Sequence, residues 1–350
     1  MRREQRVALI LGPIPKEGGV TTYIEGITAF LFRKNFFVYI LTFTKSDRSS
    51  EFLQESFDKP VKILFLPQDV YNLYKLIISE SITIIVSNLY YSLLLPFIPS
   101  KRKVHVLHGF GKVESGIARF LIGNLSNLIG NYFSSRVIAN SYLTSSVNRV
   151  LGVKNSEVAP WGVPNVFSQT KVDLPKSREI DLLYVGRIHA SKGLIQIAKG
   201  VSLCQSTYNI KLNFHIVGDL SSSLVFKENL EKLLFSVDVK FHGYVCKQDL
   251  LKLYTNAKLF ISLNPDEPFG FSYVEALSCG TPVIAPLSSG ISAFVNDKVA
   301  LLINVDSQSI SKSIFSGLSN HWNRAYISEF SKEMFSWEKS GNLILDKQNE

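Results

Sequence analysis

Cysteines, charged residues and long apolar runs are all scarce in this chain of 350 residues. The three cysteines, Cys204, Cys246 and Cys279, lie far apart and form no CxxC pair, so neither a disulfide framework nor a zinc site is expected. A reducing, cytoplasmic compartment suits such a chain. The most apolar stretch, residues 89–98, contains Pro96 and is about half as long as the roughly 20 residues of a transmembrane helix. No membrane-spanning segment is predicted.

Length and composition indicate two folded domains. Hydrophobic residues make up 46% of the chain and charged residues 19%, which excludes a largely disordered protein. Single hydrophobic cores stop growing at about 250–300 residues, so a chain of this length is expected to divide. The predicted bounds are 1–167 and 168–335, with a polar linker near 168–178 and a terminal helix in 336–350.

Short apolar runs alternate with amphipathic stretches in both halves, which predicts an α/β fold with two Rossmann-like domains. Ligands bind such sheets at the carboxyl ends of the strands, and two such domains side by side leave a cleft. The expected strands are residues 7–11, 37–43, 61–66, 82–86, 104–107, 137–139, 181–185, 212–217, 239–241, 259–262, 283–285 and 300–303, and the expected helices of the first half are 21–33, 70–79 and 115–133.

Positive charge is concentrated in the first half. Residues 1–165 contain 19 Lys and Arg against 11 Asp and Glu, a net charge of 19 − 11 = +8, whereas residues 166–350 contain 19 against 18, a net charge of +1. Such an excess fits an anionic partner, such as a membrane surface, a phosphorylated lipid or a nucleic acid. A solubilising surface explains it equally well.

One predicted helix, residues 115–133, carries few charges and an apolar face. We expect this face to pack on the sheet, as amphipathic helices of globular proteins do. The alternative is contact with a membrane interface, helped by the basic run 101–103. The apolar positions at helical spacing are Ile117, Phe120, Leu121, Leu125, Leu128 and Ile129.

Two glycines precede the helix that follows the first strand. Gly18 and Gly19 let backbone N–H groups approach an anion closely, and the helix dipole favours negative charge there. The pattern is not GxGxxG, so a dinucleotide site for hydride transfer is not expected. The pair indicates either an anion site or a tight turn.

Two cations flank the loop after the first strand of the second half. Arg187, which follows Gly186, can grip two phosphate oxygens through its planar guanidinium, while Lys192 acts as a point charge. By themselves, these two residues are more typical of solvated surface cations than of a diphosphate site.

Two acids, Glu267 and Glu275, follow the strand 259–262 and stand eight residues apart. If a helix begins near Phe271, both carboxylates can face one pocket at its N-terminus, where Gly270 allows a close backbone approach. Carboxylates accept hydrogen bonds from the paired hydroxyls of sugars. Acids are also common at exposed helix starts. The apolar neighbours of Glu275 argue against that simpler interpretation, because an acid among them needs a partner.

Together these motifs resemble the retaining glycosyltransferases of the GT-B fold, in particular the large family-4 group, over nearly the whole chain. The resemblance implies two Rossmann-like domains facing across a cleft and a C-terminal helix that crosses back to the first domain. The chain departs from the family pattern at Trp161–Pro164, where relatives often have Asn-Gly-Val-Asp. The segments that carry the resemblance are Gly18–Val20, Gly186–Gly193, Val217–Asp219, Phe241–Val245, Glu267–Glu275 and Cys279–Val283.

The resemblance also implies residue roles. Glu275 would hydrogen-bond the donor ribose, Glu267 would contact the transferred sugar, and residues 243–245 would line the base pocket. His108 would face the donor sugar, although a histidine after a strand is by itself more often structural. The implied catalytic residues are His108, Glu267, Arg187 and Lys192, and the implied donor-binding residues are Gly18, Gly19, Gly186, Gly243, Tyr244, Val245, Gly270, Phe271 and Glu275.

The implied reaction moves a sugar from a UDP- or GDP-sugar to an acceptor with retention of configuration, the departing phosphate taking the acceptor proton. No Asp-x-Asp motif stands in a suitable loop, so no metal and no cofactor is expected. The expected acceptor is a glycan or a lipid-linked saccharide of cell-surface polysaccharide synthesis. The protein would be cytoplasmic, with peripheral contact between its basic half and an anionic inner membrane face, and would not bind nucleic acid.

Two other functions fit the same architecture. The first is a catalytically silent subunit that binds and stabilises a partner transferase. The second is a sugar-nucleotide epimerase, against which the Glu-x7-Glu pair argues. The set of Glu267, Glu275, Arg187, Lys192 and His108 favours an active transferase over a silent subunit.

Overall fold

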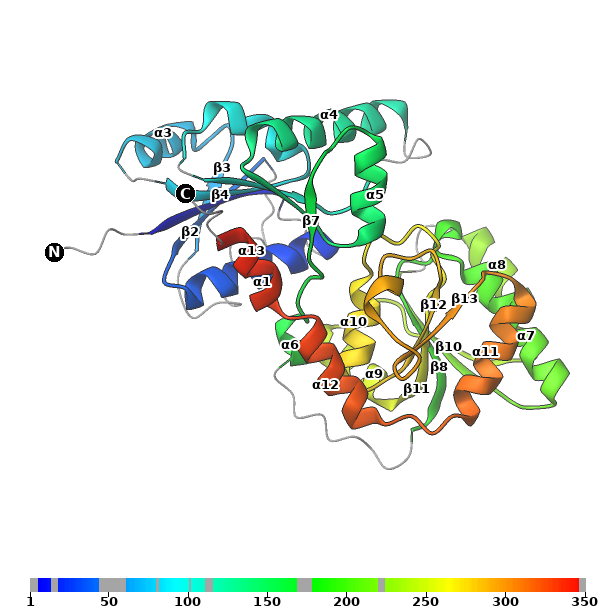
Figure 1. The fold of residues 1–350 in the computed structure, drawn as a ribbon. Coiled ribbons are helices and arrows are strands. Elements are labelled where there is room, and N and C mark those ends of the chain that lie inside the picture. Colours follow the sequence, from blue (N-terminus) through cyan, green and yellow to red (C-terminus); the bar gives the residue numbers. More distant parts are fainter. Residues whose placement is uncertain are drawn as a thin grey trace. The chain divides into compact units, whose positions relative to one another are not determined.

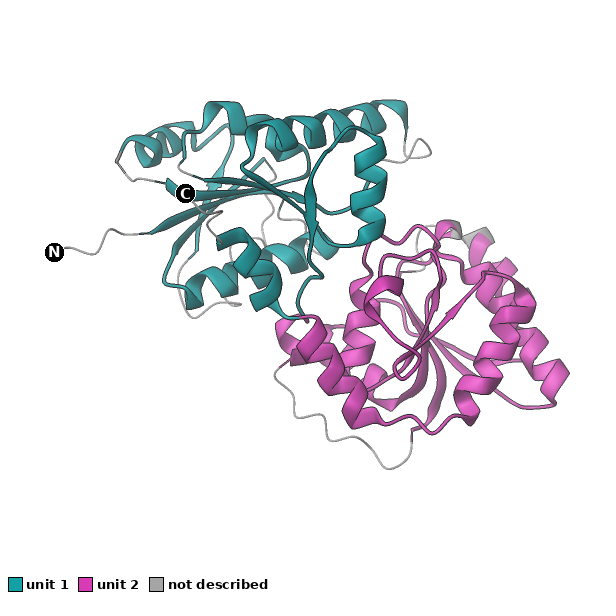
Figure 2. Ribbon diagram, in the orientation of Figure 1, with its two compact units in different colours: residues 1–162, 336–350 teal, residues 163–335 magenta. Residues whose placement is uncertain are grey.

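The computed structural model describes residues 6–13, 18–43, 61–79, 82–100, 102–110, 116–168, 178–219 and 224–345. The chain forms two compact units (Figure 2). Unit 1 comprises residues 1–162 and 336–350, and unit 2 comprises 163–335. The boundary therefore precedes the predicted one after residue 167, and the C-terminal segment belongs to unit 1. Most of the predicted linker, together with Lys101 of the basic run, lies outside the described residues.

Unit 1 is built on a parallel sheet of seven strands in the order β3-β2-β1-β4-β5-β6-β7. Its apolar strands are buried in the middle of the sheet: every residue of β1 is buried, as are the last five of β4. The strands are β1 (Val7–Leu11), β2 (Phe37–Thr42), β3 (Lys62–Phe65), β4 (Ile82–Asn88), β5 (Lys103–Leu107), β6 (Arg136–Ala139) and β7 (Ser156–Val158).

Helices cover both faces of this sheet (Figure 1). One face carries α1 (Gly19–Arg33) and α13 (Trp337–Leu345), and the other carries α3 (Val70–Ser79), the 3-10 helix η1 (Leu89–Phe97) and α4 (Ile117–Phe133). A further helix in the described part of unit 1 is α5 (Tyr142–Val150). The ring of Trp337 fills the space beside Gly26 and Gly162, where any Cβ atom would overlap it.

Unit 2 repeats the plan with a parallel sheet of six strands in the order β10-β9-β8-β11-β12-β13. Helices α7, α8 and α11 cover one face and α9, α10 and α12 the other (Figure 1). The elements are α6 (Asn165–Ser168), β8 (Ile180–Val185), η3 (Ala190–Lys192), α7 (Leu194–Tyr208), β9 (Asn213–Val217), α8 (Leu224–Leu233), β10 (Asp238–Phe241), α9 (Lys247–Asn256), β11 (Ala257–Ile261), α10 (Phe271–Ser278), β12 (Val283–Pro286), η4 (Ser292–Phe294), β13 (Ala300–Ile303), α11 (Ser307–Ser319) and α12 (Arg324–Met334).

The order of strands reverses once in each sheet, between β1 and β4 in unit 1 and between β8 and β11 in unit 2. At such a switch point the loops leave the two strands in opposite directions and open a crevice at their carboxyl ends, where ligands of these folds bind. The predicted fold class is confirmed. No helix among the described residues is both long enough and apolar enough to cross a bilayer.

The apolar face of α4 corrects a prediction. We expected it to pack on the sheet, yet Ile117, Leu121, Leu125 and Leu128 are all exposed. The residues of α4 that are buried are Ser126 and Gly130. The other two residues of the predicted face, Phe120 and Ile129, are partly buried, so the helix leaves most of its apolar face outside.

Candidate functional site

The switch point of unit 2 gathers the charged residues predicted from the sequence. Lys192 ends η3, just before α7, and its ammonium Nζ lies 2.7 Å from Oε2 of Glu267 in the loop after β11. The same oxygen accepts a hydrogen bond from Nδ2 of Asn264 at 2.8 Å. Gly193 adopts a left-handed backbone, and a Cβ atom there would overlap the carbonyl of Leu263. Its lack of a side chain therefore lets the loop that carries Lys192 approach the one that carries Glu267.

Arg187 is the second cation at this edge. Its side chain is exposed, and its backbone carbonyl accepts a hydrogen bond from the hydroxyl of Tyr184 at 3.0 Å. Burial raises the pKa of Tyr184, the Glu267 carboxylate raises that pKa further, and the Arg187 guanidinium lowers it. The pKa of Tyr184, on β8, is therefore affected by the charges of both Glu267 and Arg187.

Glu275 lies in the second turn of α10 and has a different partner. The hydroxyl of Tyr254, on α9, donates a hydrogen bond to Oε2 of Glu275 at 2.9 Å. Burial raises the pKa of Glu275 to about 7, against the opposing effects of this hydrogen bond and of the nearby Lys247. Glu275 is thus an acid whose charge changes near neutral pH.

The N-terminus of α10 lies between the two acids along the chain. Its cap, Gly270, has a left-handed backbone, and a Cβ atom there would overlap the ring of Tyr273 and crowd Glu267. Phe271 is the first residue of the helix, whose first-turn N–H groups and dipole favour an anion or an oxygen-rich ligand. The cap residue, Gly270, contributes no side-chain hydrogen bond to this end.

Three glycines join the loops that leave β8, β9 and β10. Gly186 donates its N–H to the carbonyl of Val217, and Gly218 donates to the carbonyl of Gly243 at 2.9 Å. Gly243 has a positive φ of 65°, and no described residue lies within 4 Å of where its Cβ would be. Beyond it, Tyr244 is exposed and Val245 is partly buried. The predicted base-binding segment therefore borders open space.

His108 and the glycine pair belong to unit 1. His108 follows β5, and its Nε2 lies 2.7 Å from Oδ1 of Asn88, which ends β4 at the switch point. Because Nδ2 of Asn88 donates to the carbonyl of Leu11, its Oδ1 is the acceptor and Nε2 carries the proton. Tyr23 and Trp161 pack against the imidazole, with ring centroids 5.0 and 4.6 Å away.

The imidazole of His108 is neutral. Burial, aided by the nearby His105, lowers the pKa of His108 to about 3. Its Nδ1 atom is buried without a hydrogen-bond partner among the described residues, so it presents a lone pair to a donor such as a sugar hydroxyl. Gly18 and Gly19 begin α1, with Gly18 as its cap at a φ of 135°.

Sequence reasoning missed the groups that hold the predicted side chains. Asn264 and Asn88 each stand at or just after the end of a buried strand, which is a signal the sequence offered. Tyr254 and Trp161 offered no signal, because their roles depend on elements distant in the sequence. Among the described residues, no three His, Cys, Asp or Glu side chains cluster as metal ligands would.

Comparison with known proteins gives a family match for unit 2. Residues 167–334 match the family model of the Glycosyl transferases group 1. This part of the chain is therefore similar to that family, which supports the predicted class of enzyme. The match covers unit 2. For unit 1, the comparison is the similarity of the whole chain to solved structures.

Two curated relatives are also glycosyltransferases. An uncharacterised glycosyltransferase of Methanocaldococcus jannaschii is 26% identical over 197 residues, which cover 52% of this chain and 49% of the relative. The D-inositol 3-phosphate glycosyltransferase of an Arthrobacter species is 26% identical over 209 residues, covering 54% and 49%. The chain thus matches about half the length of these relatives.

The crystal structure of Anabaena HepE in complex with UDP and glucose resembles the whole chain. The TM-score is 0.75 at 19% identity, over 97% of this chain and 98% of HepE. At this identity the likeness establishes the fold of both units.

Proposed function

We propose that this protein is a glycosyltransferase that moves a sugar from a UDP- or GDP-sugar to an acceptor, with retention and without a metal. The observation that carries the proposal is the Lys192–Glu267 pair at the switch point of a domain similar to the group 1 glycosyl transferases. A cation for the diphosphate and a carboxylate for sugar hydroxyls meet there beside the N-terminus of α10.

Each group of the site has a part in this reaction. Arg187 and Lys192 stabilise the charge that grows on the diphosphate as the glycosidic bond breaks, and the dipole of α10 adds to this. Glu267 fixes the transferred sugar and ionised Glu275 accepts a hydrogen bond from the ribose. In unit 1, His108 is a further proposed catalytic residue, with the lone pair of Nδ1 as its hydrogen-bond acceptor. The acceptor oxygen bonds to the anomeric carbon on the face from which the diphosphate departs, so no side chain acts as a covalent nucleophile. The departing diphosphate takes the acceptor proton, so no side chain is needed as a general base.

The second part of the proposal concerns the acceptor. We propose a glycan or lipid-linked saccharide of cell-surface polysaccharide synthesis, reached by peripheral contact of unit 1 with an anionic inner membrane face. The net charge of +8 in residues 1–165 and the exposed apolar face of α4 support this assignment.

A donor screen tests the transferase. The purified chain is mixed with a panel of sugar nucleotides, and both the unfolding midpoint and the release of nucleoside diphosphate are measured. One sugar nucleotide is expected to raise the midpoint, because it binds only the folded state. Diphosphate release is expected to depend on an acceptor. Binding without release under any acceptor would favour the silent subunit, and release without any acceptor would favour the epimerase.

A further inference from the structure

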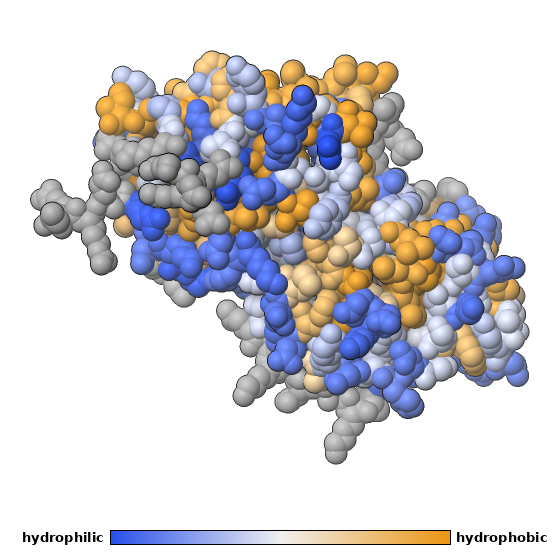
Figure 3. Space-filling model, viewed as in Figure 1, coloured by the Kyte–Doolittle hydropathy of each residue, from blue (hydrophilic) through white to orange (hydrophobic). Residues whose placement is uncertain are grey.

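The face of unit 1 that carries α3, η1 and α4 exposes a row of large apolar side chains, which we call the apolar surface. Figure 3 shows apolar residues along this edge of the molecule, over α3 and α4. Single exposed apolar residues are ordinary, but a row across three neighbouring elements is not. Its members are Tyr71, Tyr74 and Ile78 of α3, Tyr90 and Phe97 of η1, and Ile117, Leu121, Ile122, Leu125, Leu128 and Tyr132 of α4.

The buried side of α4 explains why its apolar side faces outward. Ser126 is buried, and its carbonyl accepts a hydrogen bond from the hydroxyl of Ser92 in η1. Asn127 accepts a hydrogen bond from Nε2 of His105 at 3.2 Å. A Cβ atom at Gly130 would overlap the ring of His105. Small and polar groups thus fix the rotation of the helix about its axis, and the apolar side chains cannot turn inward.

The charges on these elements favour an anionic partner. The sequences of α3, η1 and α4 contain no acid and two cations, Lys75 and Arg119. Both cations are exposed. A symmetric contact with a second copy of the chain would bring two Arg119 side chains together, whereas an anionic surface would attract Arg119. Of the run 101–103, Arg102 and Lys103 donate to the carbonyls of Leu345 and Leu95, so they are held within unit 1.

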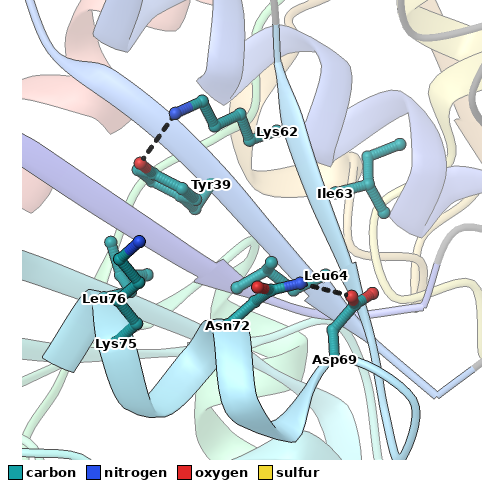
Figure 4. A pocket seen from close by; sticks show the side chains of 8 residues that line it. All are labelled: Tyr39, Lys62, Ile63, Leu64, Asp69, Asn72, Lys75 and Leu76. Carbon is teal, nitrogen blue, oxygen red and sulfur yellow. Dashed lines mark hydrogen bonds between the residues drawn. The ribbon is translucent and has the colours of Figure 1, made fainter.

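A pocket of about 460 Å³ opens beside α3, with lysines on two sides (Figure 4). Lys62 comes from β3 and Lys75 from α3, and the ammonium of Lys62 lies 3.3 Å from the hydroxyl of Tyr39. The one acid of the lining, Asp69, already accepts hydrogen bonds from Asn72 and from the N–H of Phe65. Besides Lys75 of α3, the pocket therefore contributes one more cation, Lys62.

We propose that the apolar surface of α3, η1 and α4 is the site at which this protein lies on an anionic lipid bilayer. Tyrosines suit the headgroup level, because each has an apolar ring and a polar tip. Leucine and isoleucine side chains of α4 enter the acyl boundary, and Arg119 meets lipid phosphates. This inference rests on the peripheral-membrane part of the proposed function and not on the transfer reaction.

Cosedimentation with vesicles tests the surface. The full chain is spun with vesicles of phosphatidylcholine, with and without phosphatidylglycerol, at low and high salt. Wild type is expected to bind the anionic vesicles, more weakly at high salt. The double variant Leu121→Ser with Leu125→Ser is expected to bind roughly tenfold or more weakly. Because both leucines are exposed, its unfolding midpoint should match that of wild type.

Phe235→Ser is the matched control, since Phe235 is an apolar residue of unit 2 that is 88% exposed and lies outside the apolar surface. It should bind vesicles as wild type does. The proposal fails if wild type does not bind anionic vesicles at low salt, or if the double variant binds them equally well. It also fails if the surface instead joins two copies, seen as a dimer that the double variant converts to monomers. Donor binding is measured separately, as a shift of the unfolding midpoint, and should be the same in all three proteins.

Discussion

The ammonium of Lys192 lies 2.7 Å from a carboxylate oxygen of Glu267, although 75 residues separate them in the chain. Both side chains are about one fifth exposed, at 20% and 22%. A pair this accessible contributes only about 1 kcal/mol or less to folding. Its value lies in preorganisation, because the cation and the acid are already held where the proposed donor would need them.

Removing either member of this pair should therefore cost activity and spare the fold. Lys192→Ala and Glu267→Ala are each expected to lower turnover roughly 10- to 150-fold, since one hydrogen bond to a charged group is worth about 1.5–3 kcal/mol. Steady-state kinetics with the donor found in the screen, together with urea unfolding, measure both effects.

Lys252→Ala is the matched control for this prediction. Lys252 forms an ion pair of similar length, 2.8 Å, with Asp249 on α9, but that pair is solvent-exposed. Its loss should leave turnover unchanged. Full activity in the Glu267 variant would remove that residue from the proposed machinery.

Donor affinity should rise with pH through the titration of Glu275. Its pKa in the folded protein is about 7, and only the ionised carboxylate can accept hydrogen bonds from a ribose at both oxygens. Between pH 6 and pH 8 the affinity for the nucleotide is expected to increase by up to about tenfold. Calorimetric titration at several pH values measures this, and Glu275→Gln should flatten the profile.

Tyr254→Phe tests the cause of that profile. The Tyr254 hydroxyl stabilises the ionised form of Glu275, so its removal should raise the pKa of Glu275 further. The midpoint of the pH profile is expected to move to higher pH. An unchanged midpoint would assign the titration to another group.

His108 should make the protein less stable in acid. Its pKa is about 3 when folded, against an ordinary value of 6.5, so between these values the unfolded chain binds a proton that the folded chain excludes. Stability from this group is complete above pH 6.5 and is lost as the pH falls. At pH 4.5 the loss is about 2–3 kcal/mol relative to pH 7.5.

The variant His108→Gln isolates this effect, because burial also lowers the pKa of His105 and of His215, to about 4 each. Urea unfolding of wild type and variant at both pH values gives the difference in unfolding free energy. That difference should shrink by about 2–3 kcal/mol in acid. If the difference in unfolding free energy did not change with pH, His108 would have the same pKa in the folded and unfolded states.

Two glycines of α4 should respond in opposite ways to alanine. Gly130→Ala forces a Cβ atom into the ring of His105 and is expected to cost about 1–3 kcal/mol. At Gly123 nothing lies within 4 Å of the added atom, so Gly123→Ala should stabilise the helix by about 0.5–1 kcal/mol. Thermal unfolding measures both, and equal effects would show that the contact at Gly130 relaxes without cost.

The sequence predicted the framework better than the contacts within it. Buried parallel strands such as Val7–Leu11 are continuous apolar runs, so their places and the fold class could be read directly. The short strand Ser156–Val158 is only partly buried and carries no such signal. The outward face of α4 was also missed, since the close packing at Gly130 and the Ser92 hydrogen bond decide it and depend on elements far away in the sequence.

In the candidate site, too, the sequence predicted the reactive residues better than the contacts between them. Lys192 and Glu267 could be expected near one edge, because each follows a strand of one sheet and such loops meet. The hydrogen bond between Tyr254 and Glu275 could not be predicted, since no spacing in the chain relates an α10 residue to one on α9. Local motifs give the identity of the reactive groups, and tertiary packing gives their partners and their acidity.

The ring of Trp337 fills the space beside Gly26 and Gly162, and it comes from a segment that the chain reaches only after completing all of unit 2. During synthesis the first 162 residues emerge well before their last helix. The space beside Gly26 can therefore be filled only after Trp337 has been synthesised.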